Sequence, residues 1–168
     1  MKRLIAFFAF PAIFLTACTI SYGFQGTKID YTVVKTLSIN DFTNQAEYIY
    51  DQLEYIFNEE LKNTFRRQTK LNFIPQSGDL HLEGEIVGYR ITPLGVRDNN
   101  LAASTQLTLT VKVRYTNNKA VGEDFEQTFN TSETFDSNRM LSDVEPELVP
   151  IMVKNLIDMI FNATVANW

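Results

Sequence analysis

The segment 107–115 constrains the fold of this chain more than any other part of the sequence. Its residues alternate strictly between apolar and polar. One face would carry Leu107, Leu109, Val111, Val113 and Tyr115, and the other Thr108, Thr110, Lys112 and Arg114. Side chains of a β-strand point alternately to its two faces, so this pattern predicts a strand with one face in a core and one in water. A turn at 117–119 and a strand over 123–135 follow, which predicts an antiparallel hairpin.

Two further strands are predicted upstream of this hairpin. The segment 29–39 is rich in β-branched residues, which favour strands. Leu80, Leu82 and Ile86 alternate with polar residues, and the apolar phase then changes to Val87, Tyr89 and Ile91. A β-bulge at Gly84 or Gly88 would permit this change of phase. We expect Thr92-Pro93-Leu94-Gly95 to end the strand.

Two amphipathic helices are also predicted. The first follows Asn44, which with Glu47 fits a variant of the capping box, and it ends near Thr69. The second runs from Glu147 to about Val165, after a polar loop over 136–146. It is apolar around most of its circumference, so it either packs deeply on the sheet or contacts a partner. The order β-α-β-β-β-α predicts an α+β two-layer sandwich, with two helices on one face of a four-stranded sheet.

The first residues have the pattern of an export signal. Lys2 and Arg3 precede a short apolar run that closes with Leu15-Thr16-Ala17-Cys18, which includes the sole cysteine of the sequence. A small-residue site directly before a cysteine is typical of a bacterial lipoprotein signal, and the run is shorter than the ~20 residues that span a bilayer. We therefore predict a signal peptide at 1–17, a lipidated Cys18 with a tether over 18–28, and one domain over 29–168.

Composition and motifs exclude several classes of function. The formal net charge is −5, and the signal holds two bases and no acid, so the mature part is more acidic still. An acidic domain is a poor candidate for nucleic-acid binding. With no second thiol, the mature chain has no internal disulfide and no cysteine-based metal site. The one histidine, His81, has no catalytic motif around it. We expect no catalytic or metal-binding residues, and no cofactor besides the diacylglycerol and fatty acid on Cys18.

Several segments together resemble a known family over essentially the whole mature chain. Besides the lipobox at 15–18, they are Thr43–Ala46, Phe65–Leu71, Gly78–Ile86, Leu107–Val113, Asp124–Phe129 and Val165–Trp168. In order and spacing they are similar to the lipopolysaccharide-assembly lipoprotein family, LptE, in its Bacteroidetes-type form. The resemblance implies two helices on one side of a four-stranded mixed sheet.

The resemblance also implies a function without catalysis. A protein of this family would plug, and help assemble, the LptD outer-membrane β-barrel that inserts lipopolysaccharide into the outer leaflet, and would itself bind lipopolysaccharide. Its place would be the outer membrane, lipid-anchored at the periplasmic face, because no acidic run follows Cys18. Arg90, Lys112 and Arg114 are candidates for contacts with lipopolysaccharide phosphates, which arginine and lysine bind by charge-assisted hydrogen bonds.

Two alternatives remain open at this point. The same fold would serve another non-enzymatic periplasmic lipoprotein, such as an auxiliary subunit of an envelope transporter or an adaptor. An anchored hydrolase would need paired carboxylates that flank a cleft. Glu83 and Glu85, beside His81, are the candidate pair.

Overall fold

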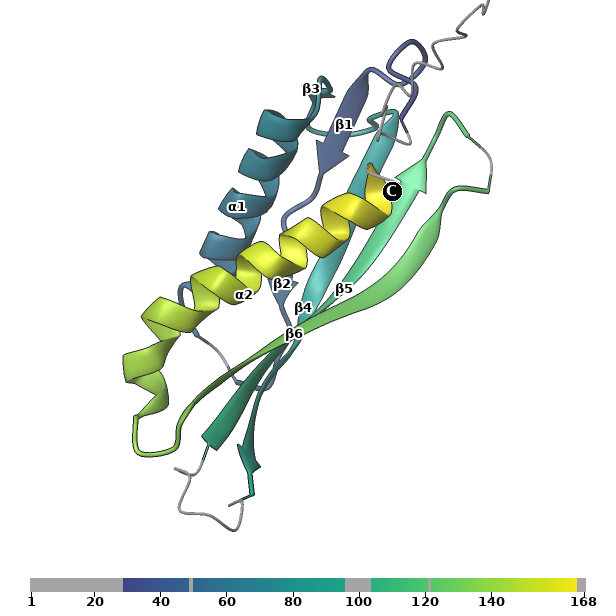
Figure 1. Ribbon diagram of the computed structural model, residues 1–168. Coiled ribbons are helices and arrows are strands. Elements are labelled where there is room, and N and C mark those ends of the chain that lie inside the picture. Colours follow the sequence, from purple (N-terminus) through teal and green to yellow (C-terminus); the bar gives the residue numbers. More distant parts are fainter. Residues whose placement is uncertain (1–28, 49, 96–103, 121, 166–168) are drawn as a thin grey trace, which may run out of the picture.

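The structure is a computed structural model that describes residues 29–48, 50–95, 104–120 and 122–165. The predicted signal peptide, Cys18 and the tether over 18–28 lie outside the described residues, as do the 98–100 loop and Trp168. The described part is a mixed β-sheet with two helices on one of its faces (Figure 1). The predicted α+β sandwich is therefore confirmed, and the number of strands is corrected from four to six.

The elements follow in the order β1, β2, α1, β3, β4, β5, β6, α2. The strands lie side by side as β3-β1-β4-β5-β6, and β2 also pairs with β4. Pairing is parallel among β1, β2, β3 and β4, and antiparallel from β4 through β5 to β6. The bounds are β1 Thr36–Ile39, β2 Thr43–Asn44, α1 Leu53–Gln68, β3 Asn72–Phe73, β4 Leu80–Leu94, β5 Ser104–Asn117, β6 Phe125–Asp136 and α2 Leu141–Thr164.

The two additional strands are short, and one of them replaces the predicted start of the first helix. Thr43 and Asn44 pair with Glu85 and Ile86 of β4, so Asn44 does not cap a helix. Its side-chain Oδ1 accepts a hydrogen bond from the Ala46 N–H over 3.0 Å, which is an Asx turn. Helix α1 begins only at Leu53. The backbone groups of Thr43 and Asn44 therefore form hydrogen bonds with β4, and not within the first turn of a helix as predicted.

Helix α2 begins earlier than predicted, inside the expected polar loop. It starts at Leu141 and contains Pro146 and Pro150. Glu145, which composition assigns to a loop, is buried, and its Oε1 accepts a hydrogen bond from the Tyr89 hydroxyl over 2.9 Å. Burial and this bond raise the pKa of Tyr89 well above its usual value. The apolar residues of α2 face the sheet, as the packed alternative predicted, and include Val149, Met152, Val153, Leu156, Ile157 and Ile160.

The β4–β5–β6 meander confirms the alternation read from the sequence. Leu107, Leu109, Val111 and Val113 are all fully buried, whereas the residues between them face away from the helices. The phase change in β4 arises from a bulge between Ile86 and Gly88, as predicted for one of the two glycines.

The limits of two strands differ from the prediction. Strand β1 begins at Thr36 rather than Ile29, because Asp30 instead organises a turn by accepting the backbone N–H groups of Thr32, Val33 and Val34. Strand β4 continues through Pro93 to Leu94. Beyond Ile86 the β2 side of β4 has no pairing strand among the described residues, and proline is tolerated where a strand has a free edge.

Gly84 allows one aromatic side chain to enter the core. Phe42 is fully buried, and its ring lies 5.1 Å from that of Phe57 on α1. A Cβ atom at Gly84 would lie 2.3 Å from Phe42 Cε1 and 2.3 Å from the carbonyl oxygen of Lys112. The Phe42 ring thus fills the space that a side chain at position 84 of β4 would occupy.

Replacing this glycine should destabilise the fold. We expect Gly84→Ala to lower the free energy of unfolding by about 1–3 kcal/mol, since the added methyl group overpacks the contact with Phe42 and the β5 backbone. Urea unfolding followed by circular dichroism measures the change. Gly95→Ala is the matched control, because no atom lies within 4 Å of its added Cβ. Equal effects of the two variants would contradict the assignment.

Candidate functional site

The face of the sheet that the helices leave open carries a row of charged side chains. They surround a shallow, open hollow of about 310 Å³. The residues that line it come from β2, β4, β5, β6 and the chain before β2, and they are Asn40, Asp41, Thr43, Glu83, Gly84, Glu85, Lys112, Arg114 and Glu126. Because side chains alternate along each strand, neighbouring strands bring their outward residues into one layer.

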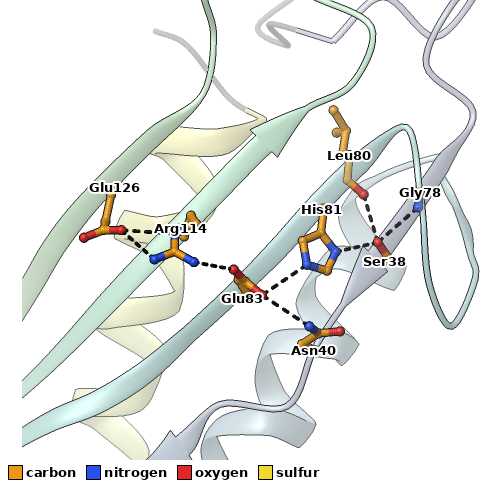
Figure 2. A network of polar contacts seen from close by, with 8 residues as sticks. All are labelled: Ser38, Asn40, Gly78, Leu80, His81, Glu83, Arg114 and Glu126. Carbon is orange, nitrogen blue, oxygen red and sulfur yellow. Dashed lines mark hydrogen bonds and ion pairs between the residues drawn. The ribbon is translucent and has the colours of Figure 1, made fainter.

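A chain of hydrogen bonds and ion pairs crosses this face from β1 to β6 (Figure 2). Ser38 Oγ lies 2.7 Å from His81 Nδ1, and His81 Nε2 lies 3.4 Å from Glu83 Oε2. Arg114 then donates to Glu83 over 2.8 Å and, through two nitrogens, to Glu126 over 2.9 and 3.1 Å. The row thus links four neighbouring strands.

The charges in this row stabilise one another. The pKa of Glu126 is lowered by hydrogen bonds from Lys112 and then from Arg114. Partial burial acts to raise the pKa of Glu83, but the hydrogen bonds and charges of Arg114 and His81 outweigh it and hold the pKa below its usual range. Glu126 and Glu83 in turn raise the pKa of Arg114. Each pair is partly exposed, so solvent screening keeps its contribution to stability small.

Ser38, His81 and Glu83 are arranged in the order of a hydrolytic triad, but Ser38 is inaccessible. Its side chain is fully buried, and its Oγ also accepts the Gly78 N–H over 3.2 Å and lies 3.4 Å from the Leu80 carbonyl oxygen (Figure 2). A nucleophile must reach the carbon that it attacks. This hydroxyl instead ties β1 to the turn before β4, which is a structural role.

The sequence did not identify Ser38. It lies in a short apolar strand, and its contact with His81 exists because the parallel register of β1 and β4 sets these two residues side by side. The positions of Ser38 and His81 in the sequence do not predict this register, because the two residues are far apart in the chain. His81, which has no catalytic motif around it in the sequence, has a protein partner at each of its two ring nitrogens.

The three predicted phosphate contacts lie on one face but not at one point. Lys112 and Arg114 are neighbours and pair with Glu126, and Arg114 also pairs with Glu83. Arg90 lies opposite Thr108, further along β5. Four residues of strand separate Thr108 from Lys112, or about 13 Å at ~3.3 Å per residue. Arg90 makes no ion pair with any described residue.

The carboxylates of the hydrolase alternative have different surroundings. Glu83 is held by Arg114 and His81, while Glu85 lies opposite Lys112 in the register. The described residues contain no group of three or more potential ligands that could hold a metal ion. Nor does either described helix have the length and apolar character needed to cross a bilayer.

Asp79 fixes the end of the sheet from which the polar row starts. Its Oδ2 accepts the backbone N–H groups of Lys35 and Thr36 over 2.8 and 3.0 Å, and its Oδ1 lies 3.1 Å from Lys119 Nζ. The Lys35 N–H is the main cause that lowers the pKa of Asp79 to about 2, against partial burial, and Lys119 and Thr36 lower it further. This carboxylate joins the starts of β1 and β4, and so helps to set the register that places Ser38 beside His81.

A protein-family model described as "LptE: Lipopolysaccharide-assembly" matches residues 34–164, which include the complete sheet and both helices. No curated protein sequence matches the chain significantly.

Three solved structures illustrate what the chain is similar to. The hypothetical protein CT253 from Chlamydia trachomatis has 14% identity and a TM-score of 0.49, over 76% of this chain and 93% of that one. A minor lipoprotein from Acinetobacter baumannii has 15% identity and a TM-score of 0.48, over 76% and 90%. The rare lipoprotein B from Shewanella oneidensis has 14% identity and a TM-score of 0.44, over 77% and 90%.

The Asp79 carboxylate should make stability depend on pH. Its pKa is lower in the folded than in the unfolded chain, so its stabilisation is complete above about pH 4 and is lost as the pH falls toward 2. At pH 7, Asp79→Asn should lower the free energy of unfolding by about 1–2 kcal/mol, and the difference from the unmodified protein should shrink below pH 4. Urea unfolding between pH 7 and pH 2 measures this. Asp158→Asn, an exposed change on α2, is the control; a deficit of Asp79→Asn that stays constant with pH would refute the assignment.

Proposed function

This chain belongs to the LptE family of lipopolysaccharide-assembly proteins, and on that basis we propose that it is an outer-membrane lipoprotein that plugs and assembles an LptD-type β-barrel. The family match over residues 34–164 is the observation that carries the proposal. In this role the protein performs no catalytic step. It occupies the periplasmic mouth and lumen of the barrel through which lipopolysaccharide reaches the outer leaflet.

The surface of the domain is suited to such a position. The interior of a transmembrane barrel is polar, so a plug needs a closed core of its own and an exterior that forms hydrogen bonds. The described core is continuous between the sheet and the two helices. The open face of the sheet carries hydroxyl, amide and charged groups, among them Thr108, Thr110 and Ser132. These are groups that a polar lumen can contact.

Anchoring at Cys18 supplies the second part of the proposal. Acyl chains on this cysteine would hold the domain at the periplasmic surface of the outer membrane. A single chain gives only marginal binding, and stable anchoring takes more than one, which the predicted diacylglycerol and fatty acid provide. The tether over 18–28 would then set how far the plug reaches from the bilayer.

Arg90, Lys112 and Arg114 remain the candidates for lipopolysaccharide contact within this proposal. Lys112 and Arg114 already hold carboxylates, so a phosphate would have to displace Glu126 or Glu83 from them. Arg90 has no such competitor among the described residues, and it lies in a hollow that also includes Tyr48 and Ile91. It is therefore the cation best placed to meet a phosphate.

The barrel partner is tested by purification from membranes. We expect the acylated protein, extracted in mild detergent, to carry with it a large outer-membrane β-barrel that mass spectrometry identifies. Cys18→Ser should abolish labelling with radioactive palmitate and move the protein from the membrane to the soluble fraction. Absence of any barrel from the purified, acylated protein would remove the proposal.

The phosphate contacts are tested by substitution. We expect Arg90→Gln to weaken lipopolysaccharide binding by the purified protein at least fivefold, and the Lys112→Gln/Arg114→Gln pair to weaken it less, because those two cations are already neutralised. Binding to immobilised lipopolysaccharide at two salt concentrations gives the comparison. If binding is unchanged when all three cations are replaced, this face does not recognise the phosphates.

A further inference from the structure

Several cations lie at the end of the molecule where β1 starts. The chain enters this end at Ile29, and the start of β1, β3 and the C-terminal end of α1 lie together there (Figure 1). Asn72 of β3 donates its N–H to the Lys35 carbonyl oxygen over 2.9 Å. Lys70 precedes Asn72 by two residues, so it also lies near the start of β1. Arg66 stands in the last turn of α1.

Two of these cations have no carboxylate partner among the described residues. Arg66 and Lys70 are exposed and take part in no ion pair with the described part of the chain. Arg67, by contrast, is paired with a carboxylate of α1 over 3.0 Å. Lys35 has the Asp30 carboxylate nearby. Arg66 and Lys70 are therefore the charges at this end that are available to an external anion.

Apolar side chains lie beside the two available cations. The Arg66 guanidinium lies over the Phe73 ring, 5.1 Å from its centroid. Arg66 and Phe73 also line an open hollow of about 260 Å³, together with Ile74 and Pro75. Protein surfaces that lie at the level of lipid headgroups combine cations with apolar side chains in this way. We call the surface formed by Arg66, Lys70, Phe73, Ile74 and Pro75 the basic corner.

Acidic side chains lie elsewhere on the molecule, whose net charge is −5. Glu123 and Asp124 are at the same end as the basic corner, but in the turn between β5 and β6, across the sheet from β3. The acids at or before the first turns of the two helices lie toward the opposite end, and they include Glu47, Asp51, Glu54, Asp143 and Glu147. An anionic surface therefore attracts the basic corner and repels most of the remaining surface.

We propose that the basic corner lies against the surface of a bilayer that contains anionic phospholipid. The inference depends on the proposed acylation of Cys18 and does not require the barrel partner. It is compatible with the barrel role, because the anchor would hold the same corner at the periplasmic mouth rather than deep in the lumen.

The anchor determines which anionic surface the corner meets. Residues 18–28 lie between the acylated cysteine and the described chain, and they span at most ~40 Å when fully extended. The corner, which adjoins the start of β1, is thus always within reach of the headgroups. Such a tether raises the effective concentration of headgroups at the corner, so a few cations are enough to orient the domain.

Proximity measurements in vesicles test this orientation. In the acylated protein the sulfur of Cys18 carries lipid, so an introduced cysteine is the one free thiol. A fluorophore on Gln68→Cys reports on the basic corner, and a fluorophore on Ser142→Cys reports on the start of α2; both positions are exposed. The vesicles contain phosphatidylcholine, alone or with an equal amount of phosphatidylglycerol, and a lipid that carries a quencher on its headgroup.

We expect a preference for the basic corner that depends on charge. In vesicles with phosphatidylglycerol, the label at position 68 should be quenched about threefold more strongly than the label at position 142, and high salt should reduce this ratio. In phosphatidylcholine alone, the ratio should fall toward one.

Charge variants identify the residues responsible. Lys70→Gln should lower the quenching at position 68 in the anionic vesicles, and Arg66→Gln/Lys70→Gln should reduce it to the level found in phosphatidylcholine. Arg139→Gln is the matched control, because it removes one exposed cation at the opposite end, and it should leave the ratio unchanged. Lys70 lies outside α1 and has no ion pair among the described residues, so its replacement leaves the fold intact, which circular dichroism checks.

Flotation of the same vesicles separates this inference from the anchor. A protein that floats with both labels quenched equally has an anchor but no preferred orientation, and the inference is then wrong. Equal quenching at position 68 with and without phosphatidylglycerol also overturns it, because the tether alone then explains the proximity. A protein that does not float has no anchor, which overturns the acylation of Cys18 and this inference together.

Discussion

The pairing of β4 with neighbours on both of its edges is the constraint on which the rest of the structure depends. Its β5 edge is antiparallel and continuous except at the bulge, and its other edge holds β1 and β2 in parallel. Because β4 is central, its alternation divides the molecule into a face covered by helices and a face open to solvent. The missing side chain at Gly84 and the Tyr89–Glu145 hydrogen bond both act through this strand, by admitting Phe42 and by holding α2.

The open face derives its chemistry from the same strand. His81 and Glu83 project from β4 toward partners on β1 and β5, so that a serine, a histidine, two acids and an arginine form one row. If only the residue types are considered and their burial is ignored, such a set resembles a catalytic site. Burial of Ser38 and neutralisation of Glu83 by Arg114 show that the row joins strands. A polar, internally paired surface is also what the proposed position inside a polar barrel lumen would require.

Helix α2 and strand β6 differ in what covers them. The apolar face of α2 is covered by the sheet, whereas β6 has one edge without a pairing strand among the described residues. The apolar circumference of α2 left open whether the helix packs on the sheet or meets a partner, and packing on the sheet accounts for Val149, Met152 and Leu156. The β6 edge has no comparable cover from the described residues. Its backbone hydrogen-bonding capacity depends on what lies outside the domain, either water or another strand.

Sequence alone determined the features that depend on local periodicity and composition. The alternation of 107–115, the hairpin with β6, the phase change in β4 and the existence of two amphipathic helices all follow from residues close together in the chain. The family resemblance belongs to the same class, whereas the lipoprotein signal at Cys18 stays a prediction. Tertiary structure decided what depends on distant neighbours. It made a strand of Thr43 and Asn44, allowed β4 to continue through Pro93, and buried Glu145 at the start of α2. It also set Ser38 beside His81 and supplied a carboxylate to each of Lys112 and Arg114. The physical reason is that register and burial are fixed by pairing between strands far apart in the sequence, and no local pattern contains that information.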